Sequence, residues 1–513
     1  MLKTLIRFDI EDALTRLSEK LQPHLRTLGI ACVINLLIFG QRLFGGGLAA
    51  DDISRFYFSG GEQASWLGRW LGGLLSQHVF SGPLHILPYF NGLISIFSIT
   101  LAGYLTAYHL SVTKRVPAII ITLLCSATPF MVHNVYFNTN TTVFIGTALG
   151  IGGLCLGYRK EWGLKILGVL FLMLSIGIYQ TIIQVSCVII LFRTILNLGD
   201  SKDAKSDFRF LLGGVYMAGY LLVAFLLSNV ANSIVTSASD MAPTGRYAES
   251  LEVVTLLTYV DRIIGCYTIH TQLNFFSGPY SMGVKLFALF GFGCLALFLN
   301  LHLPKNFLSL RAAFFVGFVG SLPIIINLPQ LLGLNVPTRA HFTIGWMMAS
   351  FFMLSYVYRT WTKNIGLLLG TYLLLFGTLY INVFFYAATR QTDMDIMRAN
   401  QIVSAIRMHP DYPGEEEPIK FKVLGVDYRT VIGWEFHRQS AFATFWSNTR
   451  IFDSFTDLNY VSLTEEEVAD VKAKLIESER TILAYPDPSS FVFLDDVVVV
   501  FIDPEALYND ETE

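Results

Sequence analysis

TTVFIGTALGIGGLCLGYRKEWGLKILGVLFLMLSIGIYQTIIQVSCVIILF, residues 141–192, is the stretch that decides the fold class of this chain. It contains three apolar runs in succession, and charged residues gather in the connection that holds Arg159, Lys160 and Glu161. A helix that crosses a lipid bilayer satisfies its backbone hydrogen bonds internally and needs about 17 to 25 mostly apolar residues. Each run meets that length, so the stretch predicts three consecutive membrane-spanning helices.

The same pattern recurs along most of the 513 residues, of which 53% are hydrophobic and only 15% are charged. The mean hydropathy of +0.52 is also above that of an ordinary soluble domain. We therefore predict a polytopic α-helical membrane protein with about 11 transmembrane helices, all within residues 27–388. The predicted spans are residues 27–44, 86–108, 116–132, 141–158, 163–179, 181–197, 210–235, 283–302, 310–328, 341–358 and 365–387.

Basic residues are concentrated in alternate connections between these spans, and such a bias is typical of cytoplasmic loops. It predicts that residues 1–26, an amphipathic segment without a signal-peptide cleavage site, lie in the cytosol. An odd number of spans then places the C-terminal tail on the outer side of the membrane. The basic residues are Lys114 and Arg115; Arg159 and Lys160; Lys202, Lys205 and Arg209; Lys305 and Arg311; and Arg359 and Lys363.

The outer side is predicted to carry two long loops, residues 45–85 and 236–282, and a soluble domain, residues 389–513. Trp66, Trp70 and Leu74 begin an apolar stripe in the first loop, and residues 253–264 repeat the pattern in the second. Both stripes predict helices that lie in the membrane interface. The tail alternates amphipathic helical patterns with the strand-like runs IKFKVLG, FVFLD and VVVVFI, which predicts a small α/β domain.

The first outer loop concentrates charge directly after the first span, in DDISR at residues 51–55. If these residues form a helical turn, Arg55 lies three and four residues after Asp52 and Asp51, so it can pair with one carboxylate. The other carboxylate stays ionised and can act as a general base. The alternative is that the acids cap an interfacial helix and pair with Arg55 to anchor the loop.

DDISR, followed by WLGRW at residues 66–70, resembles the phage-type, serotype-converting O-antigen glucosyltransferases of the GT-C class. A Tyr-Gln dipeptide inside the spans, here Tyr179 and Gln180, extends the resemblance more loosely over the chain. The resemblance implies a GT-C-like membrane domain with a periplasmic C-terminal domain in the bacterial inner (cytoplasmic) membrane. It further implies an inverting enzyme that moves a sugar, usually glucose, from undecaprenyl phosphate onto O-antigen, lipopolysaccharide or a related lipid-linked glycan.

In that reading the catalytic base is Asp51, which the resemblance favours by position, or Asp52. The leaving polyprenyl phosphate needs fixed cations, and neutral polar groups suit the sugar. Ordinary alternatives exist, because an arginine at a helix end can anchor it at the interface and a lone histidine can simply pack. The predicted phosphate- and sugar-binding residues are Arg55, Arg69, His133, Asn134, Tyr179, Gln180, Arg246 and Arg339.

The sequence holds no metal-ligand spacing, no phosphate-binding GxxxxGK[ST] loop and no GxSxG nucleophile turn, so we expect neither a metal nor another cofactor. The net charge of -3 argues against nucleic acid as a partner. Aromatic residues of the tail such as Trp434 and Trp446 suit a small core better than a glycan site. A flippase or transporter of lipid-linked sugar, an O-antigen polymerase and a non-enzymatic scaffold remain alternatives.

Overall fold

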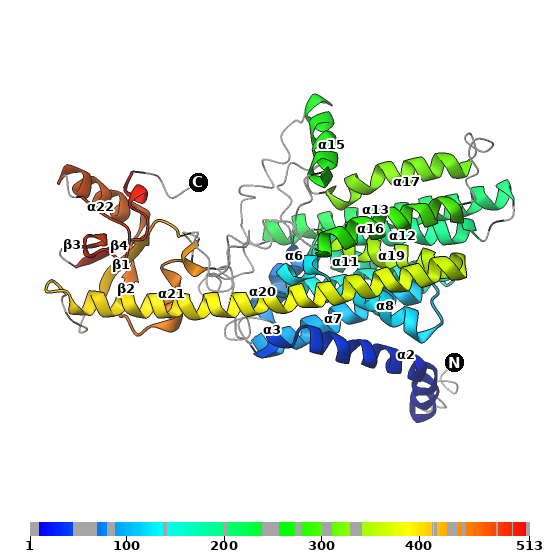
Figure 1. Cartoon of the computed structure of the whole chain (residues 1–513), viewed down its shortest axis with the longest axis horizontal. Helices are drawn as coiled ribbons and strands as arrows, with labels where there is room; N and C mark the ends of the chain where they lie inside the picture. The colour runs from blue at the N-terminus through cyan, green and yellow to red at the C-terminus, as the bar shows by residue number, and fades with distance from the viewer. Residues whose placement is uncertain are drawn as a thin grey trace.

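The computed structural model is a bundle of long helices from which a small α/β domain projects at one end (Figure 1). We call this the domain end of the bundle, and the opposite end the basic end. The structure describes residues 10–44, 69–79, 88–136, 141–199, 201, 203–238, 256–271, 279–299, 310–328, 341–412, 414, 418–427, 440–443, 447–478, 481–494 and 496–508.

Every one of the predicted apolar spans coincides with a helix or a pair of helices, which confirms a mostly helical membrane protein. Within the described residues, α7, α12, α13, α16 and α20 are long and apolar enough to cross a membrane, while the count of about 11 spans stays a prediction. The bundle helices are α2 (Ile10–Ile38), α3 (Gly40–Phe44), α7 (Pro88–His109), α8 (Arg115–Ser126), α9 (Pro129–Tyr136), α10 (Thr141–Gly157), α11 (Trp162–Ile178), α12 (Ile182–Gly199), α13 (Ala204–Ala238), α16 (Pro279–Phe298), α17 (Leu310–Ile326), α19 (Thr343–Tyr358) and α20 (Thr360–Met408).

Helix α13 presents an apolar surface on the outside of the bundle. Large apolar side chains are exposed along its length, which water would disfavour but lipid tails accommodate. By contrast, most of the apolar window of α12 is buried inside the bundle. The exposed apolar residues of α13 include Leu212, Val215, Leu222, Leu226, Val230 and Ile234.

The stretch quoted at the start, residues 141–192, forms the interior of the bundle. Helices α10 and α11 approach so closely that a Cβ atom added at Gly153 would lie 2.7 Å from the carbonyl oxygen of Gly168. The hydroxyl of Ser175 donates to the carbonyl of Gly146 at 2.7 Å. Small residues at such positions let membrane helices pack backbone to backbone, because lipid provides no hydrophobic force between them.

The predicted span 116–132 is divided into α8 and α9. Helix α8 ends at Ser126, and Pro129 starts the next helix because a proline lacks the N–H that an uninterrupted helix would require there. The break leaves α9 at the domain end as a short helix that carries His133 and Asn134.

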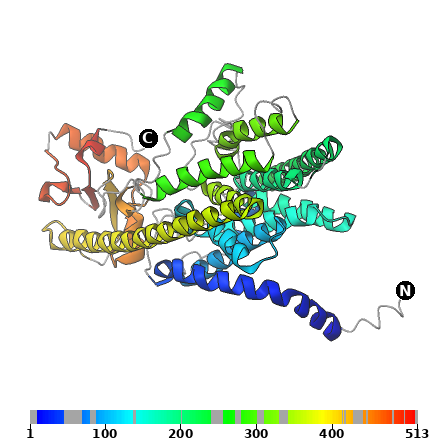
Figure 2. The same cartoon turned by 45° about the vertical axis from the view of Figure 1, so that its right-hand side comes forward.

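The direction of successive helices brings the basic connections to the end opposite the α/β domain. Lys114, Arg159, Arg209 and Arg359 all lie there, at or beside connections of the bundle. Figures 1 and 2 show the chain's N-terminus on this side and the α/β domain on the other. The grouping agrees with the charge bias of the sequence.

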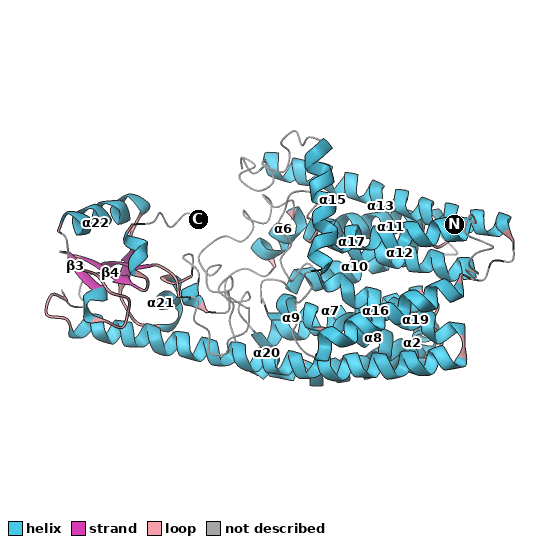
Figure 3. Cartoon of the chain, turned by 45° about the horizontal axis from the view of Figure 1, so that its top comes forward, coloured by secondary structure: helices cyan, strands magenta, loops and turns pink. Residues whose placement is uncertain are grey.

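Helix α20 runs without interruption through the predicted domain boundary at residue 388 (Figure 3). The sequence predicts a span at 365–387 and a separate amphipathic helix in the tail, but no glycine or proline occurs between Thr378 and Met408 to separate them. The helix has 49 residues, roughly 70 Å at 1.5 Å per residue. It ends before Pro410, which disfavours helical backbone at the preceding residue.

The predicted strands are confirmed in a four-stranded sheet of order β2-β1-β4-β3. Strand β1 pairs in parallel with β2 and β4, and β3 is antiparallel to β4. The sheet is covered by α20 on one face and by α22 on the other. The elements are β1 (Ile419–Leu424), η4 (Ala441–Ala443), α21 (Arg450–Phe455), β2 (Tyr460–Ser462), α22 (Glu465–Glu477), η5 (Pro488–Ser490), β3 (Phe491–Leu494), β4 (Val497–Phe501) and η6 (Pro504–Leu507).

Candidate functional site at the domain end

Four of the predicted site residues have described side chains, and all four belong to the domain end: Arg69, Asn134, Tyr179 and Gln180. The backbone of His133 is described in α9, but its side chain is outside the description. The other predicted residues lie outside the described residues, so their roles stay predictions. These are Asp51, Asp52, Arg55, Arg246 and Arg339.

Two motifs that are far apart in the sequence meet at this end. Arg69, from WLGRW, directly precedes α6 (Trp70–His78), and Tyr179, from the Tyr-Gln dipeptide, follows α11. The guanidinium carbon of Arg69 lies 4.5 Å from the centroid of the Tyr179 ring. An arginine over an aromatic face is attracted by the ring quadrupole, so this contact orients the guanidinium group.

Helix α6 packs into the bundle, whereas the sequence predicts an interfacial helix. Trp70 is only 8% exposed, and its indole N–H donates to the hydroxyl of Ser228 in α13 at 3.2 Å. The indole fits against Gly177 of α11, where a Cβ atom would overlap it. The apolar stripe therefore binds protein side chains instead of lipid headgroups, because α11 provides a glycine-sized recess for the tryptophan.

The ring of Tyr179 lies 6.5 Å from that of Phe342, between centroids, and next to Phe342 a network of buried polar side chains connects four helices. His341, fully buried before α19, has its Nε2 2.9 Å from the carbonyl oxygen of the Asn327 side chain. Asn327 donates through Nδ2 to the carbonyl of Cys266 at 3.1 Å, in α15 (Leu256–Thr271). Gln184 of α12 donates to the carbonyl of Ile326 at 3.0 Å. Polar groups at this depth are costly unless they are paired, which favours a functional role for the network.

Helix α15 occupies the second outer loop, where an interfacial helix is predicted. Val260, Ile263 and Ile264 are exposed on it, whereas Cys266 is buried. In Figure 1 the helix points away from the bundle. Its apolar residues are therefore placed to face lipid, and its contact with Asn327 ties it to α17.

A second group of buried polar residues surrounds the short helix α3. Arg42 is 2% exposed, and its Nε donates to the carbonyl of Val135 in α9 at 3.0 Å. The neighbouring residue Asn134 is also buried. In α7, the hydroxyl of Ser95 donates to that of Thr141 at 3.4 Å. Arg42 and Arg69 thus border the two ends of residues 45–68, the segment that contains Asp51 and Asp52.

Sequence reasoning missed Arg42, Gln184, Asn327 and His341. The signal for each was a polar or charged residue inside or directly beside a predicted span, which by default indicates function. The arrangement offers guanidinium groups suited to a phosphate and neutral amide and imidazole groups suited to sugar hydroxyls. Among the described residues no group of three or more His, Cys, Asp or Glu side chains is placed to hold a metal ion.

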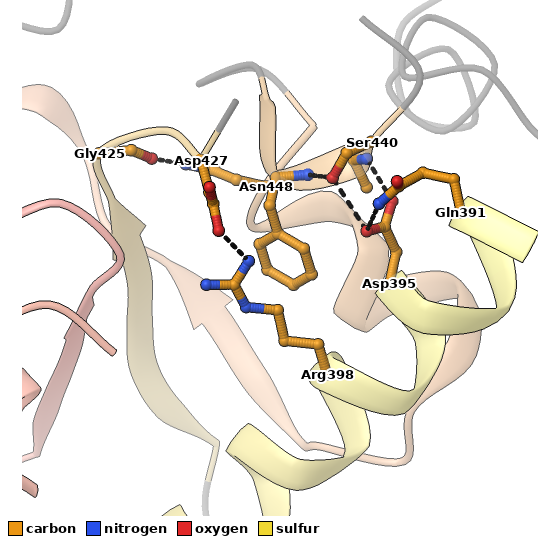
Figure 4. Close-up of polar contacts among 9 residues, drawn as sticks. Gln391, Asp395, Arg398, Gly425, Asp427, Ser440 and Asn448 are labelled. Carbon is orange, nitrogen blue, oxygen red and sulfur yellow. Dashed lines mark hydrogen bonds and ion pairs between the residues drawn. The ribbon is translucent and has the colours of Figure 1, made fainter. Parts of the chain in front are cut away.

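The α/β domain is fastened to α20 by a buried carboxylate (Figure 4). Asp395 accepts hydrogen bonds from the hydroxyl of Ser440 at 2.9 Å, the backbone N–H of Ala441 at 2.6 Å and the side-chain amide of Gln391 at 3.0 Å. Burial raises the pKa of Asp395 to about 6, against these hydrogen bonds, which lower it.

One turn further along α20, Arg398 forms an ion pair with Asp427 at 2.8 Å and lies over the ring of Phe442 at 4.9 Å. Both contacts reach chain segments of the α/β domain that also flank Ser440. The domain is therefore held on a helix that continues into the bundle.

These observations define the class of the protein, a helical membrane protein with a small α/β domain and buried polar side chains at the end of the bundle where that domain lies. Residues 43–356, more than half of the chain, match the model of the glucosyl transferase GtrII family, and the chain belongs to that family. The match confirms the resemblance drawn from DDISR and WLGRW and implies a glucosyltransferase of O-antigen modification. It ends before α20 and the α/β domain. Searches for similar curated proteins and similar solved structures find no match.

Proposed function

We propose that this glucosyltransferase takes its sugar from an undecaprenyl-phosphate carrier and transfers it, with inversion, to a hydroxyl of O-antigen or a related lipid-linked glycan at the domain end. The observation that carries the proposal is the contact of Arg69 with Tyr179, which joins the two family-like motifs above a buried polar network. A phosphate leaving group needs such a fixed, charged donor close to the lipid interface.

The reaction follows from the groups available there. Asp51 or Asp52 takes the proton from the acceptor hydroxyl while that oxygen forms a bond to the anomeric carbon. The bond from the anomeric carbon to the phosphate oxygen breaks on the opposite face, and its electron pair leaves with the undecaprenyl phosphate. One displacement of this kind inverts the anomeric configuration. Arginine side chains neutralise the negative charge of the leaving phosphate, so the proposed step uses no metal.

The arginines of the domain end fit the leaving group. Arg42 is held against α9 by the Val135 carbonyl, and Arg69 is oriented by the Tyr179 ring. Planar guanidinium groups donate pairs of parallel hydrogen bonds to phosphate oxygens. By their sequence positions, Arg55, Arg246 and Arg339 are also assigned to the leaving phosphate. Asn134 and Gln180 are assigned to hydrogen bonds with the sugar.

The orientation in the membrane is also part of the proposal. The basic end faces the cytoplasm, since Lys114, Arg159 and Arg209 gather there. The domain end and the α/β domain then face the periplasm of a bacterial cell, and the enzyme sits in the cytoplasmic membrane.

Sugar transfer in membranes with matched expression tests this function. Radiolabelled undecaprenyl-phosphate glucose and lipopolysaccharide are supplied to wild type, Asp51→Asn and Asp52→Asn, with Glu161→Gln, an exposed acid at the basic end, as control. One of the two aspartate variants is expected to lose at least about 10²-fold in rate. Full activity of both aspartate variants would refute a base in this loop. Movement of the labelled donor across the bilayer by wild type without any transfer would favour the flippase alternative.

A further inference from the structure

A cavity of about 620 Å³ lies at the basic end, on the far side of the bundle from the proposed reaction. Its walls come from α2, α7, α8, α10 and α12 and include His24, Tyr104, Tyr158 and Ser111. The ring nitrogen Nδ1 of His24 lies 2.5 Å from the Tyr104 hydroxyl, which joins α2 to α7 along one wall. The cavity is separate from the residues assigned to the transfer reaction.

The lining of this cavity is cationic. Lys114, Arg115, Arg159 and Arg193 contribute to it, and no acidic residue does. In the part of the chain that the structure describes, none of these four cations forms an ion pair with a carboxylate. Clustered cations without carboxylates repel one another, so an anion bound among them would be stabilising.

Two of the guanidinium groups are held in place by neutral oxygens. Nη1 of Arg193 donates to the carbonyl of His109 at 2.8 Å and to the hydroxyl of Ser111 at 2.7 Å. Nη2 of Arg159 donates to the hydroxyl of Tyr108 at 2.6 Å. These bonds use part of each donor fork and leave N–H groups for a ligand, as a preorganised anion site requires.

The buried imidazole of His109 forms part of the cavity wall. His109 lines the cavity, is 7% exposed and packs edge-on against Tyr158 at 4.8 Å between ring centroids. Its Nε2 is buried and, among the described residues, has no hydrogen-bond partner. The imidazole therefore contributes a polar wall to the cavity, while the cations supply its N–H donors.

The surroundings indicate a lipid. Leu25 follows His24 and Val116 follows Arg115 in sequence, and both are well exposed, as is Trp162 three residues after Arg159. Apolar side chains on this rim suit acyl chains, while the cations suit a headgroup. We propose that the cavity holds the phosphate headgroup of an anionic phospholipid from the leaflet at the basic end, with its acyl chains along α2 and α8.

Lipid retention by the full-length protein in nanodiscs tests the assignment. Discs contain phosphatidylcholine with a small fraction of phosphatidylglycerol, and native mass spectrometry counts the phosphatidylglycerol that stays bound. Wild type is expected to retain it preferentially, and Arg193→Gln and Arg159→Gln are each expected to weaken binding about fivefold. Arg209→Gln removes the same charge from the same end outside the cavity and should change binding less than twofold.

Lys114→Gln, at an exposed edge of the cavity, tests the same charge dependence in a variant that leaves buried packing untouched. Equal losses in Arg209→Gln and Arg193→Gln would show generic surface attraction and overturn the proposal. So would equal retention of both lipids by wild type. In a second arm, inorganic phosphate is titrated into the nanodiscs that retain phosphatidylglycerol. Displacement of phosphatidylglycerol by millimolar phosphate would identify a free-phosphate site instead of a lipid site.

Discussion

At the domain end of the bundle, Arg42 and Arg69 are packed against a backbone carbonyl and a tyrosine ring, among buried amide and imidazole groups. At the basic end, Arg159 and Arg193 line an open cavity without carboxylate partners among the described residues. Arginine is expensive to bury, so its presence inside the domain end indicates chemistry there. Of the basic-end arginines, Arg159 is exposed and Arg193 half-buried, and we assign both to the proposed lipid site.

The largest difference in stability is expected between two glycine substitutions at opposite ends of α11. Gly177→Leu at the domain end forces a side chain into the space of the Trp70 indole, so we expect a loss of about 3 kcal/mol in unfolding free energy and displacement of α6. At the basic end a Cβ atom added at Gly163 has no atom within 4 Å, so Gly163→Leu should change stability by less than about 0.5 kcal/mol. Thermal unfolding of both variants in detergent measures this, and equal melting temperatures would mean that α6 does not dock as described.

The next largest loss of stability is expected from the buried polar network around Asn327. Asn327→Leu removes the partners of His341 and of the Cys266 carbonyl, which should cost about 2 kcal/mol because buried polar groups lose their hydrogen bonds. Arg159→Gln at the basic end breaks an exposed hydrogen bond to Tyr108 and should cost under about 1 kcal/mol in neutral detergent. A smaller loss in Asn327→Leu than in Arg159→Gln would show that the network contributes nothing to stability.

The pH dependence of stability should differ in sign between the ends. Asp395 has a pKa raised by burial to about 6, so the folded state binds its proton more tightly than the unfolded state. Its contribution, up to about 3 kcal/mol, is full below about pH 4 and is lost as the pH rises through 6. Asp395→Asn should flatten that decline, whereas Asp393→Asn, an exposed neighbour, should not.

Asp207 at the basic end behaves in the opposite way. Hydrogen bonds from Arg311, at 2.8 and 2.9 Å, hold the pKa of Asp207 below its usual value. Its contribution is therefore present above about pH 4 and is lost as the pH falls below it. Melting curves between pH 3 and pH 8 should show that Asp207→Asn is less stable than wild type near neutral pH and equal to it near pH 3, because only the ionised carboxylate pairs with Arg311. An equal loss in Asp207→Asn at pH 3 and at pH 8 would contradict the ion pair as the cause.

The fold was largely predictable from the sequence, because apolar length and residue alternation determine helices and strands almost directly. Gly153 and Ser175 lie within predicted spans, and IKFKVLG and VVVVFI form strands as predicted. The sequence did not predict that α20 is continuous. Its pattern changes from apolar to amphipathic near residue 388, and such a change is typical of a domain boundary even where no residue breaks the helix. The position of α6 depends on a recess in α11 that only the tertiary structure creates.

The site was predictable only in part. Arg69 and Tyr179 were each expected to bind substrate, and the structure brings them together. Asp51 and Asp52 lie outside the described residues, so the identity of the base rests on sequence. Arg42 and His341 lie at the ends of predicted spans. Whether a polar residue there is buried depends on tertiary packing, which the sequence pattern does not show.

The most direct test of the central claim compares sugar transfer by two variants that each remove one positive charge, Arg69→Gln at the domain end and Arg209→Gln at the basic end. Rates are measured in membranes with matched expression and the radiolabelled undecaprenyl-phosphate donor. We expect a loss of about 10²-fold for Arg69→Gln, because a fixed donor to the leaving phosphate is removed, and a change of less than about twofold for Arg209→Gln. Full activity of Arg69→Gln, or an equal loss in both variants, would contradict a reaction centre at the domain end.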